Sequence, residues 1–151
     1  MFLLLDIDGV MVQVAPWKKV DIHPDGFFEF LPQAVISLNH ILIETGASIV
    51  LTTSHKSSYS LNEWDEFFQN RGIVAKLDKL DDTTHLVSRK DEILNWLSKT
   101  GHQKNFVIID DDHSLHDLPS ELKEKVVFTQ SLIGLTHEKA INAIQILKET
   151  P

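Results

Sequence analysis

The amino-acid sequence predicts an α/β fold of three layers, in which helices flank both faces of a parallel sheet of about five strands. Short apolar segments alternate with longer amphipathic segments, and no repeat or low-complexity run interrupts them. This alternation is typical of β-α-β units. The first apolar segment, residues 2–5, is continuous, as in a strand buried on both faces. We therefore expect it near the centre of the sheet.

The composition predicts one domain, residues 1–151. A chain of 151 residues with 42% hydrophobic and 24% charged residues is long enough and apolar enough to fold without cross-links. The chain has no cysteine, which excludes structural disulfides, thiolate zinc sites and a cysteine nucleophile. Because Asp6 and Asp8 follow its apolar start at once, that start is neither a signal-peptide core nor a membrane-spanning helix. We expect a cytoplasmic protein without membrane contact.

The charge balance limits the partners. Fourteen basic and 22 acidic residues give a net charge of −8. Nucleic-acid backbones attract clusters of Lys and Arg, so the net charge does not support nucleic-acid binding, although a local basic patch is compatible with it. Nothing in the sequence indicates an oligomeric state.

Two helices are predicted in the first half of the chain. Pro32 begins a segment whose apolar residues lie on one stripe, and Gly46 stands where such a helix commonly stops. Ser60 and Glu63 have the spacing of a capping box. The second helix therefore begins after Ser60, and we expect it to end near Arg71.

Two more helices are predicted in the second half. Ser88 begins one, with Gly101 beyond its end, and Thr136 caps the last. Apolar segments between the helices are predicted strands. The predicted strands are residues 2–5, 47–51, 73–77, 106–109 and 126–128.

Acidic residues follow two of these strands. Asp6 and Asp8 come after the first, and Asp110 and Asp111 come after a later one. Parallel α/β sheets bind ligands outside the carboxyl ends of their strands, so neighbouring strands would bring these carboxylates together and raise their pKa values. Mg²⁺, which is typically held by a few carboxylates plus a phosphate, would relieve the repulsion. Aspartate after a strand is also ordinary turn chemistry, and the recurrence at two strands favours the metal site.

Three further residues are candidates for binding a phosphate. Thr52 and Thr53 end the second predicted strand and offer hydroxyls and backbone amides to an anion, although each also suits a turn or cap. Lys90 lies in the first turn of the helix that Ser88 begins, where the helix dipole disfavours a cation. A nearby phosphate and carboxylates would reverse that effect.

In order and spacing, these segments resemble the phosphatase branch of the haloacid dehalogenase (HAD) superfamily, which implies a Rossmann-like (HAD-like) fold. The first family motif, an apolar strand followed by D-x-D-G-V, is similar to residues 3–10, and the second, a strand ending in Ser or Thr, to residues 49–54. The third, a basic residue before a helix, matches residues 88–97. The fourth, an apolar strand ending in paired acids, matches residues 106–111.

A narrower resemblance is to the small HAD domains associated with RNA-repair proteins. It rests on the pattern Arg-Lys-x-Glu-Ile-x-x-Trp-Leu at residues 89–97, on the acid-ended strand and on Gly134-Leu-Thr136 before the last helix. The second motif of those relatives is rich in serine and ends in tryptophan, whereas here it reads Thr-Thr-Ser and ends at His55.

The resemblance implies a Mg²⁺-dependent phosphomonoester hydrolase. Asp6 would attack phosphorus and form an aspartyl-phosphate, while Asp8 would protonate the leaving oxygen and then deprotonate water. The metal would bind Asp6, the backbone carbonyl of Asp8, Asp110 and, directly or through water, Asp111.

The same resemblance assigns the phosphate contacts. Lys90 and the hydroxyl of either Thr52 or Thr53 would hold the non-bridging oxygens. Gly9 would supply a tight turn that brings backbone amides close to the phosphate.

No cap domain fits between the motifs. Residues 10–31 are irregular, with several prolines and aromatic residues, and suggest a turn and a short hairpin that form a flap. The site should therefore be open and suit a macromolecular phosphate, unless the flap or a second subunit closes over a small molecule. Trp17, Lys18, Lys19 and Phe27 are candidates to line the flap, and the two aromatic residues equally suit packing.

Other classes of function remain as alternatives. A catalytically silent HAD-like domain would bind a phosphorylated protein or nucleic-acid partner, but the joint presence of Asp6, Asp8, Lys90 and Asp110 speaks against it. A receiver-type phosphoacceptor would carry its aspartate after a middle strand, where Thr52 stands instead. Metal-dependent nuclease or primase chemistry would need a further Glu-bearing strand, which is not evident.

The eight histidines raise the hypothesis of a zinc site. His113 and His116 have i, i+3 spacing beside the acidic run, but no third ligand matches them. His55 follows the second strand, and the sequence leaves open whether it contacts substrate.

Overall fold

Five parallel strands form one sheet in the order β3-β2-β1-β4-β5, in a computed structural model that describes residues 1–81, 88–100 and 105–149. The first strand in the chain is the central one, as its continuous apolar sequence predicted. The strands are β1 (Phe2–Leu5), β2 (Ser48–Leu51), β3 (Leu77–Lys79), β4 (Phe106–Asp110) and β5 (Val126–Phe128).

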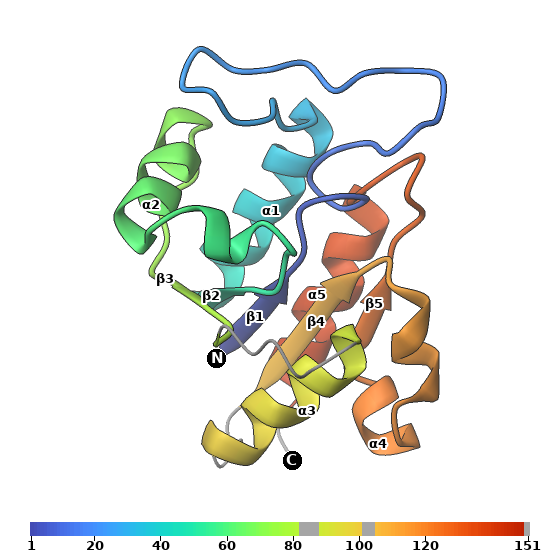
Figure 1. Ribbon diagram of the computed structural model, residues 1–151. Coiled ribbons are helices and arrows are strands. Elements are labelled where there is room, and N and C mark those ends of the chain that lie inside the picture. Colours follow the sequence, from blue (N-terminus) through green and yellow to red (C-terminus); the bar gives the residue numbers. More distant parts are fainter. Residues whose placement is uncertain (82–87, 101–104, 150–151) are drawn as a thin grey trace.

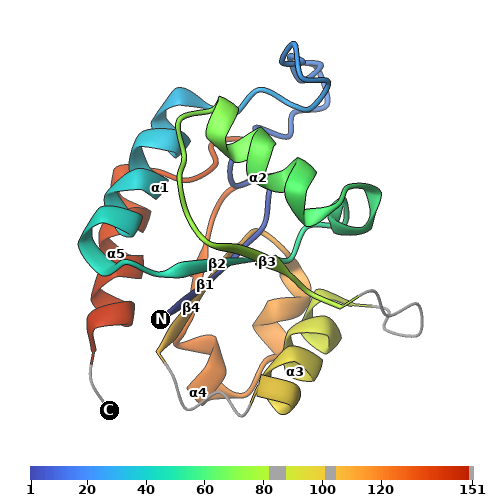
Figure 2. The same ribbon diagram turned by 90° about the vertical axis from the view of Figure 1, so that its left-hand side faces the viewer.

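Helices cover both faces of the sheet and complete three layers (Figures 1 and 2). Successive side chains of a strand point to opposite faces, and Leu3 of β1 accordingly packs in a core with α1, α2 and α5, whereas Leu4 packs in a second core with α3. The α-helices are α1 (Pro32–Thr45), α2 (Leu61–Asn70), α3 (Arg89–Thr100), α4 (Ser120–Lys123) and α5 (His137–Lys148). Two short 3₁₀ helices are η1 (Lys56–Ser58) and η2 (His113–Asp117).

The predicted start and stop of α1 and the predicted starts of α2 and α3 are confirmed. Pro32 is the first residue of α1, and Gly46 ends that helix in the left-handed conformation with φ of +66°. The Ser60 hydroxyl accepts the Glu63 N–H (3.2 Å) while the Glu63 carboxylate accepts the Ser60 N–H (3.0 Å), which is the predicted capping box. The Ser88 hydroxyl likewise accepts the Asp91 N–H at 3.1 Å and caps α3.

The last two helix signals have different outcomes. The Thr136 hydroxyl accepts the Lys139 N–H at 3.3 Å and caps α5 as predicted. Gly101, expected beyond the end of α3, lies outside the described residues.

One predicted strand is wrong in position: residues 73–76 of the predicted segment 73–77 are not a strand, and β3 begins only at Leu77. The reason is the end of α2. Gly72 has a φ of +79°, its N–H donates to the Gln69 carbonyl (3.0 Å), and the Ile73 N–H donates to the Phe68 carbonyl (2.9 Å). These two bonds make a Schellman motif. Ile73 is therefore buried as the apolar residue of a helix end and not as part of a strand.

Residues 10–31, the flap, contain only isolated bridges and turns between β1 and α1, and no cap domain (Figure 1). The predicted hairpin corresponds to the antiparallel bridge between Ile22 and Phe28. Phe27 is a packing residue, because it is 2% exposed and stacks on Phe67 with ring centroids 5.1 Å apart. Trp17, in contrast, is 74% exposed. Among the described residues, no helix has the length and apolar character needed to cross a membrane.

Candidate active site

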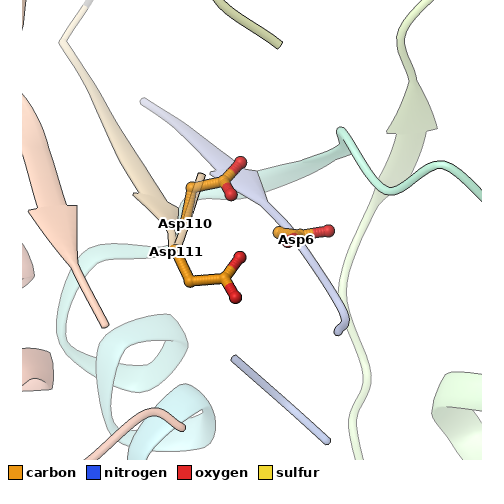
Figure 3. Close-up of side chains that lie close together, drawn as sticks. All are labelled: Asp6, Asp110 and Asp111. Atoms are coloured by element: carbon orange, nitrogen blue, oxygen red, sulfur yellow. The ribbon is translucent and has the colours of Figure 1, made fainter. Parts of the chain in front are cut away.

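The pairing of β1 with β4 brings the two acidic segments together. Leu5 is the register partner of Ile109, and the Asp6 N–H donates to the Ile109 carbonyl at 3.2 Å. Asp6 and Asp110 therefore lie side by side at the carboxyl edge of the sheet. One carboxylate oxygen from each of Asp6, Asp110 and Asp111 lies within 4.8 Å of the others (Figure 3). We call these three residues the acid cluster.

The electrostatics of the acid cluster favour a positive partner. Asp6 is 5% exposed and Asp110 is fully buried. Burial, followed by the neighbouring charge of Asp110, raises the pKa of Asp6 well above its ordinary value, and burial also raises the pKa of Asp110. Two buried carboxylates this close cannot both be ionised at low cost unless a cation lies beside them.

The cation that contacts the acid cluster is Arg89. Its Nη1 atom donates to Asp110 Oδ2 (2.5 Å) and lies 3.5 Å from Asp6 Oδ1. Burial alone would lower the pKa of Arg89, but the Asp110 and Asp6 carboxylates raise it. Arg89 is the first residue of α3, because the Ser88 hydroxyl accepts the Asp91 N–H at 3.1 Å. Its charge is thus permanent and is held against the acids.

Lys90, the basic residue that the sequence indicated, has different surroundings. Its backbone N–H donates to the Ser114 hydroxyl at 3.1 Å, and its side chain is not among the contacts of the acid cluster. The sequence singled out Lys90, whereas in the structure its neighbour Arg89 makes the contacts with Asp6 and Asp110.

An ion pair between Glu92 and Lys56 also contacts Arg89 and was not predicted. Glu92, one turn further along α3, has Oε1 3.7 Å from Arg89 Nε and Oε2 2.6 Å from Lys56 Nζ. The side chain of Lys56 is 9% exposed. Arg89 Nε is buried without a hydrogen bond among the described residues. The i, i+3 spacing of Arg89 and Glu92 was the sequence signal available for this contact.

The two threonines after β2 are both buried but have different contacts. Thr52 Oγ1 lies 3.5 Å from Asp110 Oδ2 and accepts from Arg89 Nη1 at 3.3 Å. Thr53 Oγ1 instead accepts the His55 N–H at 3.2 Å, within the turn that follows. Geometry therefore places the Thr52 hydroxyl at the acid cluster.

Asp8 lies beside the acid cluster but outside it. Its side chain is 39% exposed, and its Oδ2 atom lies 2.8 Å from Nε2 of His55. The His55 ring meets the edges or faces of Phe27 and Phe28 at centroid distances of 6.0 and 5.4 Å. His55, whose role the sequence left open, thus contacts Asp8, the predicted acid/base. The Asp8 carboxylate is separate from the three carboxylates that could hold a metal.

Gly9 makes room for the third carboxylate. Its φ is +82°, and a Cβ atom at this position would lie 2.0 Å from Asp111 Oδ2. The Gly9 N–H donates to the Val12 carbonyl at 2.8 Å, so this amide closes the turn. The same oxygen, Asp111 Oδ2, accepts a hydrogen bond of 2.7 Å from the Ser131 hydroxyl, a contact that the sequence did not indicate.

The described residues do not support the zinc hypothesis. Their one group of three potential metal ligands is the acid cluster. The ring of His116 stacks instead on Phe128, with centroids 4.1 Å apart and planes inclined by 3°, and the ring of His113 lies 5.9 Å from that of His116. These contacts are those of packed rings.

The donor set of the acid cluster fits Mg²⁺. Hard divalent cations prefer carboxylate oxygens, and three such oxygens converge here. Two of them belong to Asp6 and Asp110, whose pKa values are raised mainly because burial opposes ionisation, and a bound cation would favour the ionised form. A parallel sheet with acids after β1 and β4, a hydroxyl after β2 and a basic residue beginning α3 defines a HAD-type domain.

The comparison with protein families makes this assignment more specific. The family described as the HAD domain in Swiss Army Knife RNA repair proteins matches residues 2–140, and the chain belongs to this family. A search among curated proteins found no match.

Proposed function

We propose that this protein is a Mg²⁺-dependent phosphomonoester hydrolase in which Asp6 is the nucleophile. The observation that carries the proposal is the convergence of Asp6 with Asp110 and Asp111 at one sheet edge, with Arg89 bonded to Asp110 beside them. Bound by these three carboxylates, Mg²⁺ would supply the positive charge that lets a carboxylate approach a phosphate dianion.

Asp6 and Asp8 would divide the chemistry between them. An oxygen of Asp6 forms a bond to phosphorus as the bond to the leaving oxygen breaks, and Asp8 gives that oxygen its proton. Water then attacks the aspartyl-phosphate and transfers a proton to Asp8, so that inorganic phosphate leaves and Asp6 is regenerated. The exposed, separate position of the Asp8 carboxylate, beside His55, supports this division.

Arg89 and Thr52 are the residues that we propose to hold the non-bridging oxygens. Both lie against Asp110, and a fixed cation and a hydroxyl suit an anion whose charge shifts during transfer. This proposal moves the basic role from Lys90 to its neighbour.

For the substrate, we propose a phosphate at the end of a macromolecule. The Asp8 carboxylate is 39% exposed, and the flap adds no domain above it. The description of the family, which refers to RNA repair proteins, favours an RNA end. The net charge of −8 implies that such an end would be recognised locally.

The test is hydrolysis of p-nitrophenyl phosphate and of oligonucleotides phosphorylated at either end, with and without Mg²⁺. We expect Mg²⁺-dependent phosphate release that a chelator abolishes and that Asp6→Asn eliminates. Asp8→Asn should accumulate phosphoenzyme or turn over slowly. Activity that survives Asp6→Asn would rule out covalent catalysis at this residue, and a folded wild type that binds but never hydrolyses the phosphorylated probes would favour the silent binding domain.

A further inference from the structure

Asp111 is the member of the acid cluster that follows β4. Asp110 is the last residue of β4, whereas Asp111 lies one residue beyond it. Its side chain is instead fixed between Gly9, which leaves the necessary space, and Ser131, whose hydroxyl donates to Asp111 Oδ2 at 2.7 Å. Ser131 lies in the segment between β5 and α5 and is half-buried.

The backbone of the same segment is bonded to the base of the flap. The Ser131 carbonyl accepts the Val14 N–H (2.8 Å), and the Leu135 N–H donates to the Val10 carbonyl (2.7 Å). The side-chain amide of Gln13 also donates to the carbonyl of Leu132 at 2.8 Å. Ser131 thus holds the third carboxylate with its side chain and the flap with its backbone.

We infer that Ser131 is a positioning residue for the metal site, which orients Asp111 toward the cation and couples the site to the flap. This inference rests on the proposed function only in requiring that the acid cluster binds a divalent cation. A hydroxyl that donates to one carboxylate oxygen fixes the rotation of the group and leaves its other oxygen free for a ligand bond. Such outer partners typically change metal affinity by about 10-fold to 100-fold when removed.

The first test is binding of Mn²⁺ alone to the full chain, because Mn²⁺ also takes oxygen ligands. The electron paramagnetic resonance signal of the free ion measures how much Mn²⁺ is unbound. We expect Ser131→Ala to weaken binding by about tenfold, and Ser131→Thr, which keeps the hydroxyl, to retain most of the affinity. Gln130→Ala is the matched control, because Gln130 is an exposed neighbour in the same segment. Circular dichroism checks that each variant is folded.

The second test separates positioning from a simple loop contact. Amide hydrogen exchange at Val14 is measured with and without saturating Mn²⁺. In the wild type and Gln130→Ala we expect the metal to slow exchange at Val14, and in Ser131→Ala we expect no slowing even at saturation. Equal Mn²⁺ affinity in Ser131→Ala and wild type would overturn the inference and leave the proposed function standing. Absence of Mn²⁺ binding by the wild type would overturn the metal site and the inference together.

Discussion

Arg89 and Lys90 are neighbours in sequence with different electrostatic surroundings. As the first residue of α3, Arg89 meets two buried carboxylates that reverse the unfavourable effect of the helix dipole. Glu92 and the acid cluster hold its guanidinium from two sides. A planar guanidinium offers several fixed donors, so Arg89 can keep its bond to Asp110 and still present a donor to a phosphate oxygen.

Arg89→Met should therefore lower phosphatase activity by a factor on the order of 100, as expected for loss of a charged donor to the transferring group. Lys90→Met is the matched control, since it removes a neighbouring positive charge from the same turn, and it should have little effect. Steady-state kinetics on p-nitrophenyl phosphate measure both. The reverse order of effects would return the role to Lys90, as the sequence first indicated.

At the scale of elements, an ion pair fastens the flap to the end of α2. Arg71 donates to both oxygens of Asp25, at 2.7 and 3.0 Å, and its guanidinium lies 4.9 Å from the ring centroid of Phe30. The side chains are 2% and 10% exposed. The hydrogen bond from Arg71 is the main cause that lowers the pKa of Asp25 below its ordinary value.

Removing this pair should destabilise the fold in a pH-dependent way. Asp25→Asn leaves the Arg71 charge buried without its partner, and we expect a loss of about 3 kcal/mol in the free energy of unfolding at neutral pH. Because the pKa of Asp25 is lower in the folded state, its contribution is complete above the ordinary carboxyl pKa of about 3.9 and is lost as the pH falls below it.

Urea unfolding at several pH values measures this effect. The difference between wild type and Asp25→Asn should shrink toward acid pH, whereas Asp21→Asn, the same change at an exposed site of the flap, should have little effect at any pH. A difference that stays constant down to acid pH would contradict the role given to the ionised carboxylate.

The elements also show what local sequence can and cannot predict. Helix ends depend on caps within one turn, so Pro32, Ser60 and Thr136 located them correctly. The segment at 73–77 was wrongly predicted as a strand, because an apolar residue buried after a helix end cannot be told by sequence from the first residue of a strand. Only the hydrogen bonds around Gly72 distinguish the two.

For the site, adjacency of strands was the deciding information. Acids after two apolar strands predicted the acid cluster, because parallel strands end at one edge. The contacts of His55 and Ser131 are tertiary: His55 lies 47 residues from Asp8, and Ser131 lies 20 residues from Asp111 on a segment without a motif. No local pattern contains them, which is why the sequence left the role of His55 open and gave no sign of Ser131.

At the scale of the whole molecule, two of the 22 acidic residues are placed where burial opposes their ionisation. The chain carries a net charge of −8, and two carboxylates of the acid cluster are almost fully buried. Their pKa values are raised by burial first, and that of Asp6 also by Asp110, although Arg89 acts in the opposite direction. The folded protein therefore retains protons that the unfolded chain loses, and these residues favour folding less as the pH rises from their ordinary pKa values toward the raised ones.

Mg²⁺ should reverse this dependence. A cation bound by the acid cluster displaces the retained protons, so its stabilising effect should be larger near pH 8 than near pH 5. At a concentration about 100 times its dissociation constant at pH 8, the ion should add about 2.7 kcal/mol to the free energy of unfolding at that pH. The same concentration should add less at pH 5. Thermal unfolding with Mg²⁺ or with chelator at both pH values measures the increment, and Asp110→Asn should reduce it strongly. An increment equal at the two pH values would mean that the ion displaces no protons from these buried carboxylates.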